Sequence, residues 1–177
     1  GVFGKIGMNK AGLGLFFNIL GHRADAPGGV PVHVLAAAVL GDAATVDEAV
    51  ELLRSAPIRT SGAFTLIDTE TAACAELSPV GVPVLRPVDG YLPHTNHFLD
   101  PTNAQGEKPG LYEPDSQDRH ALILSRLHAN PAPTRADDLL ECLHSEPGQP
   151  RLCCVPATGA VFGDRWATLA TVLLEPA

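Results

Sequence analysis

The sequence predicts an α+β fold in which helices cover antiparallel sheet, and three observations lead to this prediction. Residues 4–17, 61–91 and 167–174 show the alternating apolar pattern of strands, interrupted by turn residues. Two stretches with helical character separate the first two of these regions, and two more precede the third. Strands joined by short polar turns pair antiparallel, and helices of this length bury one face against a sheet.

The first hairpin is predicted over residues 4–17. Apolar residues alternate on both sides of residues 9–12, where Asn begins and Gly ends a four-residue turn. The glycines here lack the spacing of a dinucleotide or phosphate loop, and a strand rather than a helix follows them. We therefore interpret them as hairpin glycines, followed by a loop over residues 18–29.

Two helices are predicted next. Pro31 suits a first helical turn, and residues 32–40 leave almost no polar face, which indicates a buried helix packed against the sheet. Thr45 and Glu48 have the spacing of a capping box and begin a second helix that ends before Pro57.

A second hairpin is predicted from residues 61–67 and 73–77, which flank the polar turn of residues 68–71. Residues 84–91 are expected to form another strand pair that turns at Asp89-Gly90.

The C-terminal part is predicted to begin with a loop over residues 99–114. A helix capped by Asp115 or Ser116 should run to about His128, and one capped by Thr134 should end near His144. Residues 167–174 are rich in β-branched and small apolar residues and should form the last strand, with Asp164 and Arg165 before it.

Composition limits the function classes. A chain of 177 residues, 45% of them hydrophobic, is expected to form one domain. Its net charge of −8 argues against sequence-independent binding to nucleic acid or to an anionic membrane, because both need cationic clusters. The longest apolar run, near residues 34–40, is too short to span a bilayer. Small-molecule or protein partners are therefore expected.

The four cysteines, Cys74, Cys142, Cys153 and Cys154, do not have the spacing of a disulfide framework, which favours reduced thiols and a cytoplasmic location. A metal site could combine Cys142, His144, Cys153 and Cys154, but the paired spacing of a structural zinc site is absent, so we predict no metal and no cofactor.

The pentapeptide His94-Thr95-Asn96-His97-Phe98 is the strongest candidate for a site, because four polar side chains meet where a strand should end. The amide of Asn96 could donate a hydrogen bond to a carbonyl oxygen on which negative charge develops. Taken alone, the pentapeptide favours the simpler interpretation that these residues satisfy the backbone groups of a turn, since local polar clusters usually serve turns.

Motifs along the whole chain resemble the acyl-CoA:6-aminopenicillanate acyltransferase family of autoprocessed N-terminal-nucleophile hydrolases. The motifs, in order, are Gly4-Lys5-Ile6-Gly7-Met8-Asn9 with Ala11-Gly12, Asn18, Gly29-Val30-Pro31 with His33, Glu76-Leu77-Ser78-Pro79, His94-Thr95-Asn96-His97, and Arg165 before Ala167-Thr168-Leu169.

The resemblance implies a four-layer αββα sandwich, here incomplete, and a cysteine nucleophile exposed by self-cleavage, with its own α-amino group as the base. It also implies catalytic roles for Asn96, in the oxyanion hole, and for Arg165, which would hold a carboxylate or tune the thiolate. Arg165 could instead form a surface ion pair with Asp164. His94, Thr95 and His97 are expected to contact substrate, an acyl donor or amide.

The nucleophilic cysteine of the family should lie before Gly1, and the family normally continues beyond Ala177. We therefore expect this chain to be the central and C-terminal part of a processed large subunit, with the small subunit released by self-cleavage as a possible partner. The intact parent would then be an acyltransferase or amidohydrolase that uses a cysteine acyl-enzyme. The alternative is a catalytically inactive fragment or degenerate binding module without a nucleophile.

Overall fold

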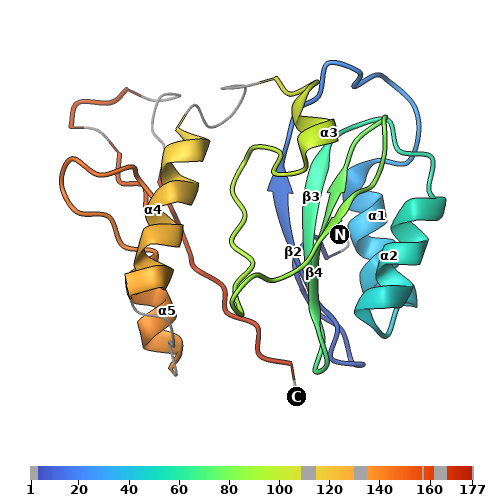
Figure 1. Cartoon of the computed structure of the whole chain (residues 1–177), viewed down its shortest axis with the longest axis horizontal. Helices are drawn as coiled ribbons and strands as arrows, with labels where there is room; N and C mark the ends of the chain where they lie inside the picture. The colour runs from blue at the N-terminus through green and yellow to red at the C-terminus, as the bar shows by residue number, and fades with distance from the viewer. Residues whose placement is uncertain (1–3, 109–114, 130–134, 157, 162–166, 177) are drawn as a thin grey trace. The chain divides into compact units, whose positions relative to one another are not determined.

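The computed structural model describes residues 4–108, 115–129, 135–156, 158–161 and 167–176 (Figure 1). The chain divides into two compact units, one of residues 1–116 with 174–177 and the other of residues 117–173. The elements are both helical and extended, which confirms the α+β class. No helix in the described residues is long and apolar enough to cross a membrane.

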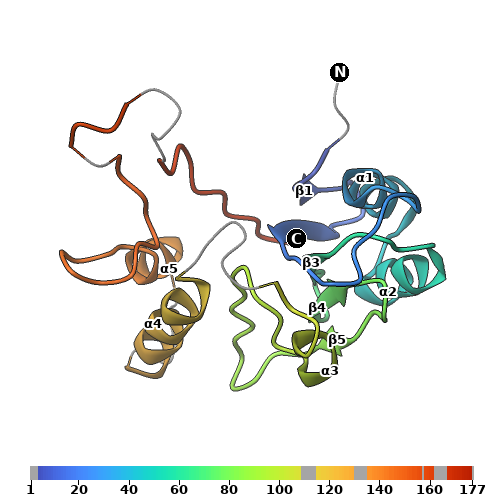
Figure 2. The ribbon, with the colours of Figure 1, turned by 90° about the horizontal axis from the view of Figure 1, so that it is seen from above.

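The first unit contains one five-stranded sheet in which every neighbouring pair is antiparallel. The strands are adjacent in chain order, β1-β2-β3-β4-β5 (Figure 2). Their bounds are β1 Gly7–Met8, β2 Gly14–Ile19, β3 Gly62–Ile67, β4 Ala72–Leu77 and β5 Val84–Leu85.

The first hairpin is confirmed, and Asn9 organises its turn. The side-chain oxygen of Asn9 accepts from the backbone N–H of Ala11 at 3.0 Å and of Leu13 at 3.1 Å. Its amide nitrogen donates to the carbonyl oxygens of Ala43 at 2.7 Å and Leu40 at 3.2 Å. These last two carbonyls lie at the C-terminal end of the following helix, where backbone acceptors lack partners within the helix. Asn9 therefore ties the hairpin turn to that helix.

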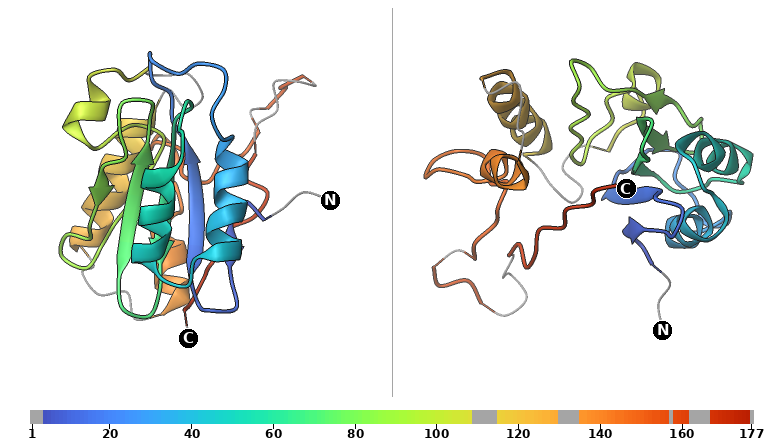
Figure 3. Two further views of the ribbon diagram at one scale, coloured as in Figure 1. Left: turned by 90° about the vertical axis from the view of Figure 1, so that its right-hand side faces the viewer. Right: turned by 90° about the horizontal axis from the view of Figure 1, so that it is seen from below.

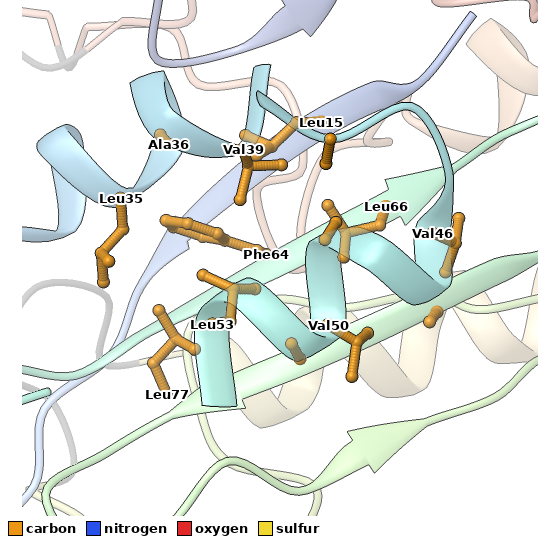
Figure 4. Close-up of a cluster of buried hydrophobic side chains, with 14 of the residues drawn as sticks. Leu15, Leu35, Ala36, Val39, Val46, Val50, Leu53, Phe64, Leu66 and Leu77 are labelled. Carbon is orange, nitrogen blue, oxygen red and sulfur yellow. The ribbon is translucent and has the colours of Figure 1, made fainter. Parts of the chain in front are cut away.

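Helices α1 (Val32–Asp42) and α2 (Val46–Ser55) cover one face of the sheet, side by side (Figure 3). The main core lies between them and the strands, around the fully buried Phe64 (Figure 4). Pro31 is the N-cap of α1 and lies just before the first turn in which it was expected. The helix is less buried than its composition indicates, since Val34 is 54% exposed. Only one side of this uniformly apolar helix contacts the sheet.

The N-terminus of α2 has the cap that the sequence predicts. The Thr45 hydroxyl oxygen accepts from the Glu48 N–H at 3.2 Å. The Glu48 carboxylate reaches back to the N–H of Ala44, at 2.7 Å, one residue before the position it takes in a standard capping box. Both interactions satisfy donors near the start of the helix.

Asp68, in the turn between β3 and β4, connects the second hairpin to α2. Its carboxylate accepts from the N–H groups of Glu70 at 2.9 Å and Thr71 at 2.8 Å within the turn, and from the N–H of Val46 at 2.8 Å in α2. Partial burial raises the pKa of Asp68, but these three hydrogen bonds and the nearby Arg86 outweigh it, so the net pKa is lowered.

We expect Asp68→Ala to lower the free energy of unfolding by about 1–2 kcal/mol, because it removes a cap and leaves turn donors unpaired. The loss should shrink on acidification. A lowered folded-state pKa contributes stability above the unfolded value, and this contribution disappears as the pH falls through the folded one. Urea unfolding at neutral and acid pH measures both effects. Glu70→Ala, in the same exposed turn, is the control, and an equal loss there would contradict the role of Asp68.

The other face of the sheet carries a smaller apolar cluster of Leu20, Ala63, Cys74 and Phe98. The segment of residues 86–108 lies on this face, opposite α1 and α2 (Figure 2). The expected strand pair over residues 84–91 is reduced to β5 and one isolated bridge between Val88 and Tyr91. The turn at Asp89-Gly90 is present, with positive φ at both residues.

A short helix, α3 (Pro101–Ala104), interrupts the loop predicted over residues 99–114. The Asp100 side chain caps it by accepting from the N–H groups of Thr102 and Asn103. Asp-Pro is a cap followed by a residue suited to a first turn, and this local signal was missed.

The second unit contains α4, which begins at the boundary as Ser116–Ala129, and α5 (Ala136–Cys142). The residue that precedes α5 is Arg135. The predicted cap, Thr134, lies outside the described residues.

The strand predicted over residues 167–174 is wrong for this structure, which shows no strand there. Thr168 instead bonds to Cys154, through the Thr168 N–H at 2.9 Å and through its hydroxyl oxygen at 2.9 Å. Leu169 is 95% exposed. The pattern of β-branched residues is only a preference, and a strand also needs a neighbour with which to pair. The αββα arrangement with a second sheet stays a prediction.

Candidate active site

Asn96 is distant from β2 in sequence, but its side chain contacts the last residue of that strand. Its amide nitrogen donates to the carbonyl oxygen of Ile19, the last residue of β2, at 3.1 Å. Its backbone N–H donates to the Ser116 hydroxyl oxygen at 2.7 Å. The side chain is therefore oriented from one side by a strand end and the backbone is held from the other.

Thr95, His97 and Ser116 form a hydroxyl–imidazole cluster beneath Asn96. The Thr95 hydroxyl donates to the Ser116 carbonyl at 3.0 Å, and the Ser116 hydroxyl donates to the Thr95 oxygen at 3.0 Å. His97 Nδ1 lies 2.9 Å from the Ser116 hydroxyl oxygen and 3.1 Å from that of Thr95. Thr95 and Ser116 are buried, so the hydrogen bonds of this cluster hold the loop of residues 95–97 in place from its buried side.

Glu76 is a fully buried carboxylate on β4, and it anchors the segment that follows Asn96. One oxygen accepts from the N–H of Leu99 at 2.6 Å, and the other accepts from the N–H of Asp100 at 3.0 Å. His94 Nε2 lies 2.9 Å from the same oxygen that Leu99 contacts. The side chains of Glu76 and His94 are 0% and 1% exposed, so this is a buried pair.

The contacts of His94 require a protonated ring. Nε2 faces a Glu76 carboxylate oxygen, and Nδ1 lies 2.8 Å from the Thr95 carbonyl oxygen. Both partners only accept, so both ring nitrogens must carry a proton. Burial lowers the pKa of His94, but its interactions with Cys74 and Glu76 outweigh this and raise the pKa to about 10. His94 is thus an imidazolium at neutral pH.

A second carboxylate, Glu107, lies close to this pair. Burial raises its pKa and the charge of Glu76 raises it further, although the Phe98 N–H, which donates to Glu107 at 3.1 Å, lowers it. The backbone of Glu107 also forms an isolated antiparallel β-bridge with the backbone of His22. Gly106 packs against the His22 ring so closely that a Cβ there would lie 1.8 Å from Nε2. These contacts connect residues 106 and 107 to the loop that follows β2.

A pocket of about 380 Å³ opens beside the end of β2. Ile19, whose carbonyl orients Asn96, is one of its lining residues. The rest of the lining comes from β2 itself, the loop after it, the start of α1 and the residues just before β3; it consists of Phe17, Leu20, Asp25, Ala26, Pro27, Gly28, Pro31, Val32, His33, Thr60 and Ser61.

The predicted site residues of the pentapeptide therefore lie together, whereas Arg165 lies outside the described residues. His94 and Thr95 are buried and bonded to protein groups, and their contact with substrate stays a prediction, as it does for His97. Sequence reasoning named Glu76 as part of a family motif and Ser116 as a candidate helix cap, but it did not place either residue in the site. A signal for Glu76 was available, since a glutamate among apolar residues on a strand that is buried on both faces needs a partner.

The cysteines of this chain differ in burial. Cys74 is buried in the sheet, Cys142 and Cys154 are half-buried, and Cys153 is exposed. Within the described ranges, no three His, Cys, Asp or Glu side chains come together in a way that could hold a metal ion. In particular, Cys142, His144, Cys153 and Cys154 do not form such a group.

Comparison with known proteins identifies the family. A sequence model of the family described as acyl-coenzyme A:6-aminopenicillanic acid acyl-transferase matches residues 1–177. The chain belongs to this family. The chain is also similar to the acyl-coenzyme A:6-aminopenicillanic-acid-acyltransferase 40 kDa form of Emericella nidulans, with 32% identity over 127 residues. The alignment covers 70% of this chain and 34% of that acyltransferase, so the chain corresponds to about a third of its length.

Proposed function

We propose that the protein that contains this chain is an acyltransferase or amidohydrolase, in which a cysteine attacks an acyl carbonyl and Asn96 stabilises the tetrahedral intermediate. Membership of the acyltransferase family supports the acyl-transfer chemistry. The placement of Asn96 carries the assignment of its role: its amide nitrogen is held by the Ile19 carbonyl at a strand end beside a pocket.

The role of Asn96 follows from amide chemistry. An amide NH₂ group has two N–H donors, and the bond to the Ile19 carbonyl fixes the direction of the group. A donor that is oriented before the reaction stabilises an oxyanion without reorganising, which makes such groups effective in the transition state. The hydroxyl cluster and the Glu76–His94 pair hold the Asn96 backbone on either side.

The nucleophile implied by the family resemblance is a cysteine upstream of Gly1, activated by its own α-amino group. An unperturbed α-amine titrates near pH 7–8 and can accept the thiol proton. Cys74 is a poor substitute because it is buried, and an internal cysteine has no adjacent α-amine. The acyl group would pass from the cysteine thioester to an amine or to water, and Arg165 would hold a substrate carboxylate or tune the thiolate.

The proposal is tested by labelling the complete gene product and residues 1–177 with a thioester acyl donor, phenylacetyl-coenzyme A. Mass spectrometry of the complete protein should find self-cleavage before a cysteine and one acyl group on that cysteine. Residues 1–177 alone should take up no stoichiometric label and show no turnover.

Three outcomes separate the alternatives. A single label on the new N-terminal cysteine supports the acyl-enzyme. Rapid stoichiometric labelling of Cys74, Cys142, Cys153 or Cys154, with turnover, would overturn the assigned nucleophile. A complete gene product that neither cleaves itself nor takes up acyl groups would identify an inactive or binding module instead.

A further inference from the structure

The pocket beside the end of β2 has a largely apolar wall with one carboxylate. Phe17 and His33 form an edge-to-face pair, with ring centroids 5.4 Å apart, and Ile19 and Val32 add aliphatic surface. An apolar cavity of about 150 Å³ holds a benzene ring. A volume of about 380 Å³ therefore accommodates a phenyl-sized group together with a polar substituent.

Asp25 is the carboxylate in this wall, and its orientation is fixed by two hydrogen bonds. Oδ1 accepts from the Ser61 hydroxyl at 2.7 Å, and Oδ2 accepts from the His22 N–H at 2.9 Å. A carboxylate offers about four acceptor positions, so both oxygens keep acceptor capacity. Among the residues that the structure describes, the half-buried Asp25 carboxylate of this pocket has no ion-pair partner.

We propose that this pocket binds the acyl side chain of the substrate and that Asp25 selects side chains carrying an ammonium group. Ile19 lines the pocket, and its carbonyl oxygen accepts from the Asn96 amide, so the pocket begins at the residue that orients the proposed oxyanion donor. The apolar wall favours an aromatic or short aliphatic body. Asp25 favours a cation at its end and repels a carboxylate.

This inference rests on the proposed acyl-transfer function, but binding to the pocket can be measured without catalysis. Three phenyl compounds of similar size carry a positive, a neutral and a negative group: benzylamine, benzyl alcohol and benzoate. NMR titration of the complete processed protein should show benzylamine binding about tenfold more tightly than benzyl alcohol, the difference expected for one hydrogen bond to a charged group. Benzoate should bind more weakly than both.

Two variants in the pocket and one control variant outside it locate the effect. Asp25→Asn keeps the shape of the side chain and should remove the preference for benzylamine while benzyl alcohol still binds. Ala26→Trp places a large side chain in the pocket and should weaken the binding of both benzylamine and benzyl alcohol. Glu51→Gln removes one exposed negative charge on α2, and it should leave the tenfold preference unchanged.

A kinetic experiment compares two thioesters as acyl donors: phenylacetyl, and phenylglycyl, which carries an additional ammonium group. The complete enzyme should have the higher kcat/KM for phenylglycyl, and Asp25→Asn should reverse or abolish this order. A preference for benzylamine that survives Asp25→Asn, or equal binding of benzylamine and benzoate, would overturn the proposal. Charge-selective probe binding without any acyl transfer would leave the pocket assignment standing and would instead contradict the proposed function.

Discussion

In the complete processed protein, Asn96→Ala should lower kcat about 10²- to 10³-fold, because it removes a preorganised donor to the oxyanion. KM should change little, since the bond to the oxyanion forms fully only in the transition state. The variant also loses the bond from the Asn96 amide to the Ile19 carbonyl, which should cost about 1 kcal/mol of folding stability. Steady-state kinetics and thermal unfolding on the same preparation separate the two effects.

The control for this variant is Thr102→Ala, a change in the exposed part of the same segment. The control should keep full turnover. An Asn96→Ala enzyme that retains more than about a third of its turnover would remove the side chain from the mechanism. A loss of activity that follows only the loss of folded protein would point to a structural role.

The elements with local signals could be predicted from the sequence. The two hairpins and α2 each have a turn or cap whose partners are fewer than five residues apart, such as Thr45 with Glu48, whereas α1 has no side-chain cap and was indicated by Pro31 and its apolar run. The same kind of signal places α4. Asp68 already shows the limit of such reasoning, because its third bond, to Val46, joins residues 22 positions apart.

The support of the candidate site could not be predicted in the same way. Glu76 contacts His94 and Leu99, 18 and 23 residues away, and the Asn96 amide reaches Ile19 over 77 residues. The alternation of apolar residues predicted the strand that carries Glu76, but it did not predict which groups would compensate the charge of its carboxylate. The strand predicted over residues 167–174 was wrong because composition alone supported it. The composition of these residues favours a strand, but a strand also needs a partner with which to pair, and composition does not specify that partner.

The buried pair of Glu76 and His94 gives the largest expected effect on stability. His94→Gln removes a cation from a fully buried carboxylate, and breaking a buried ion pair on one side costs about 3–5 kcal/mol. That is a large share of the roughly 5–15 kcal/mol that stabilises a typical domain. Glu76→Gln should also be costly, because one of the backbone donors at Leu99 and Asp100 then faces an NH₂ group. The double variant should be less destabilised than the sum of the two, since no charge is left unpaired.

The pH dependence of unfolding identifies the contribution of His94. Its folded-state pKa, about 10, lies above the ordinary value of 6.5, so the folded protein holds a proton that the unfolded chain releases between these values. The stabilisation is therefore complete below about pH 6.5 and declines as the pH rises toward 10. Urea unfolding across this range should show the decline in the wild type and a flatter profile in His94→Gln, whereas His128→Gln, at an exposed position, should keep the wild-type slope. Identical slopes in all three proteins would mean that His94 is neutral in the folded state, and both ring-nitrogen assignments would then be wrong.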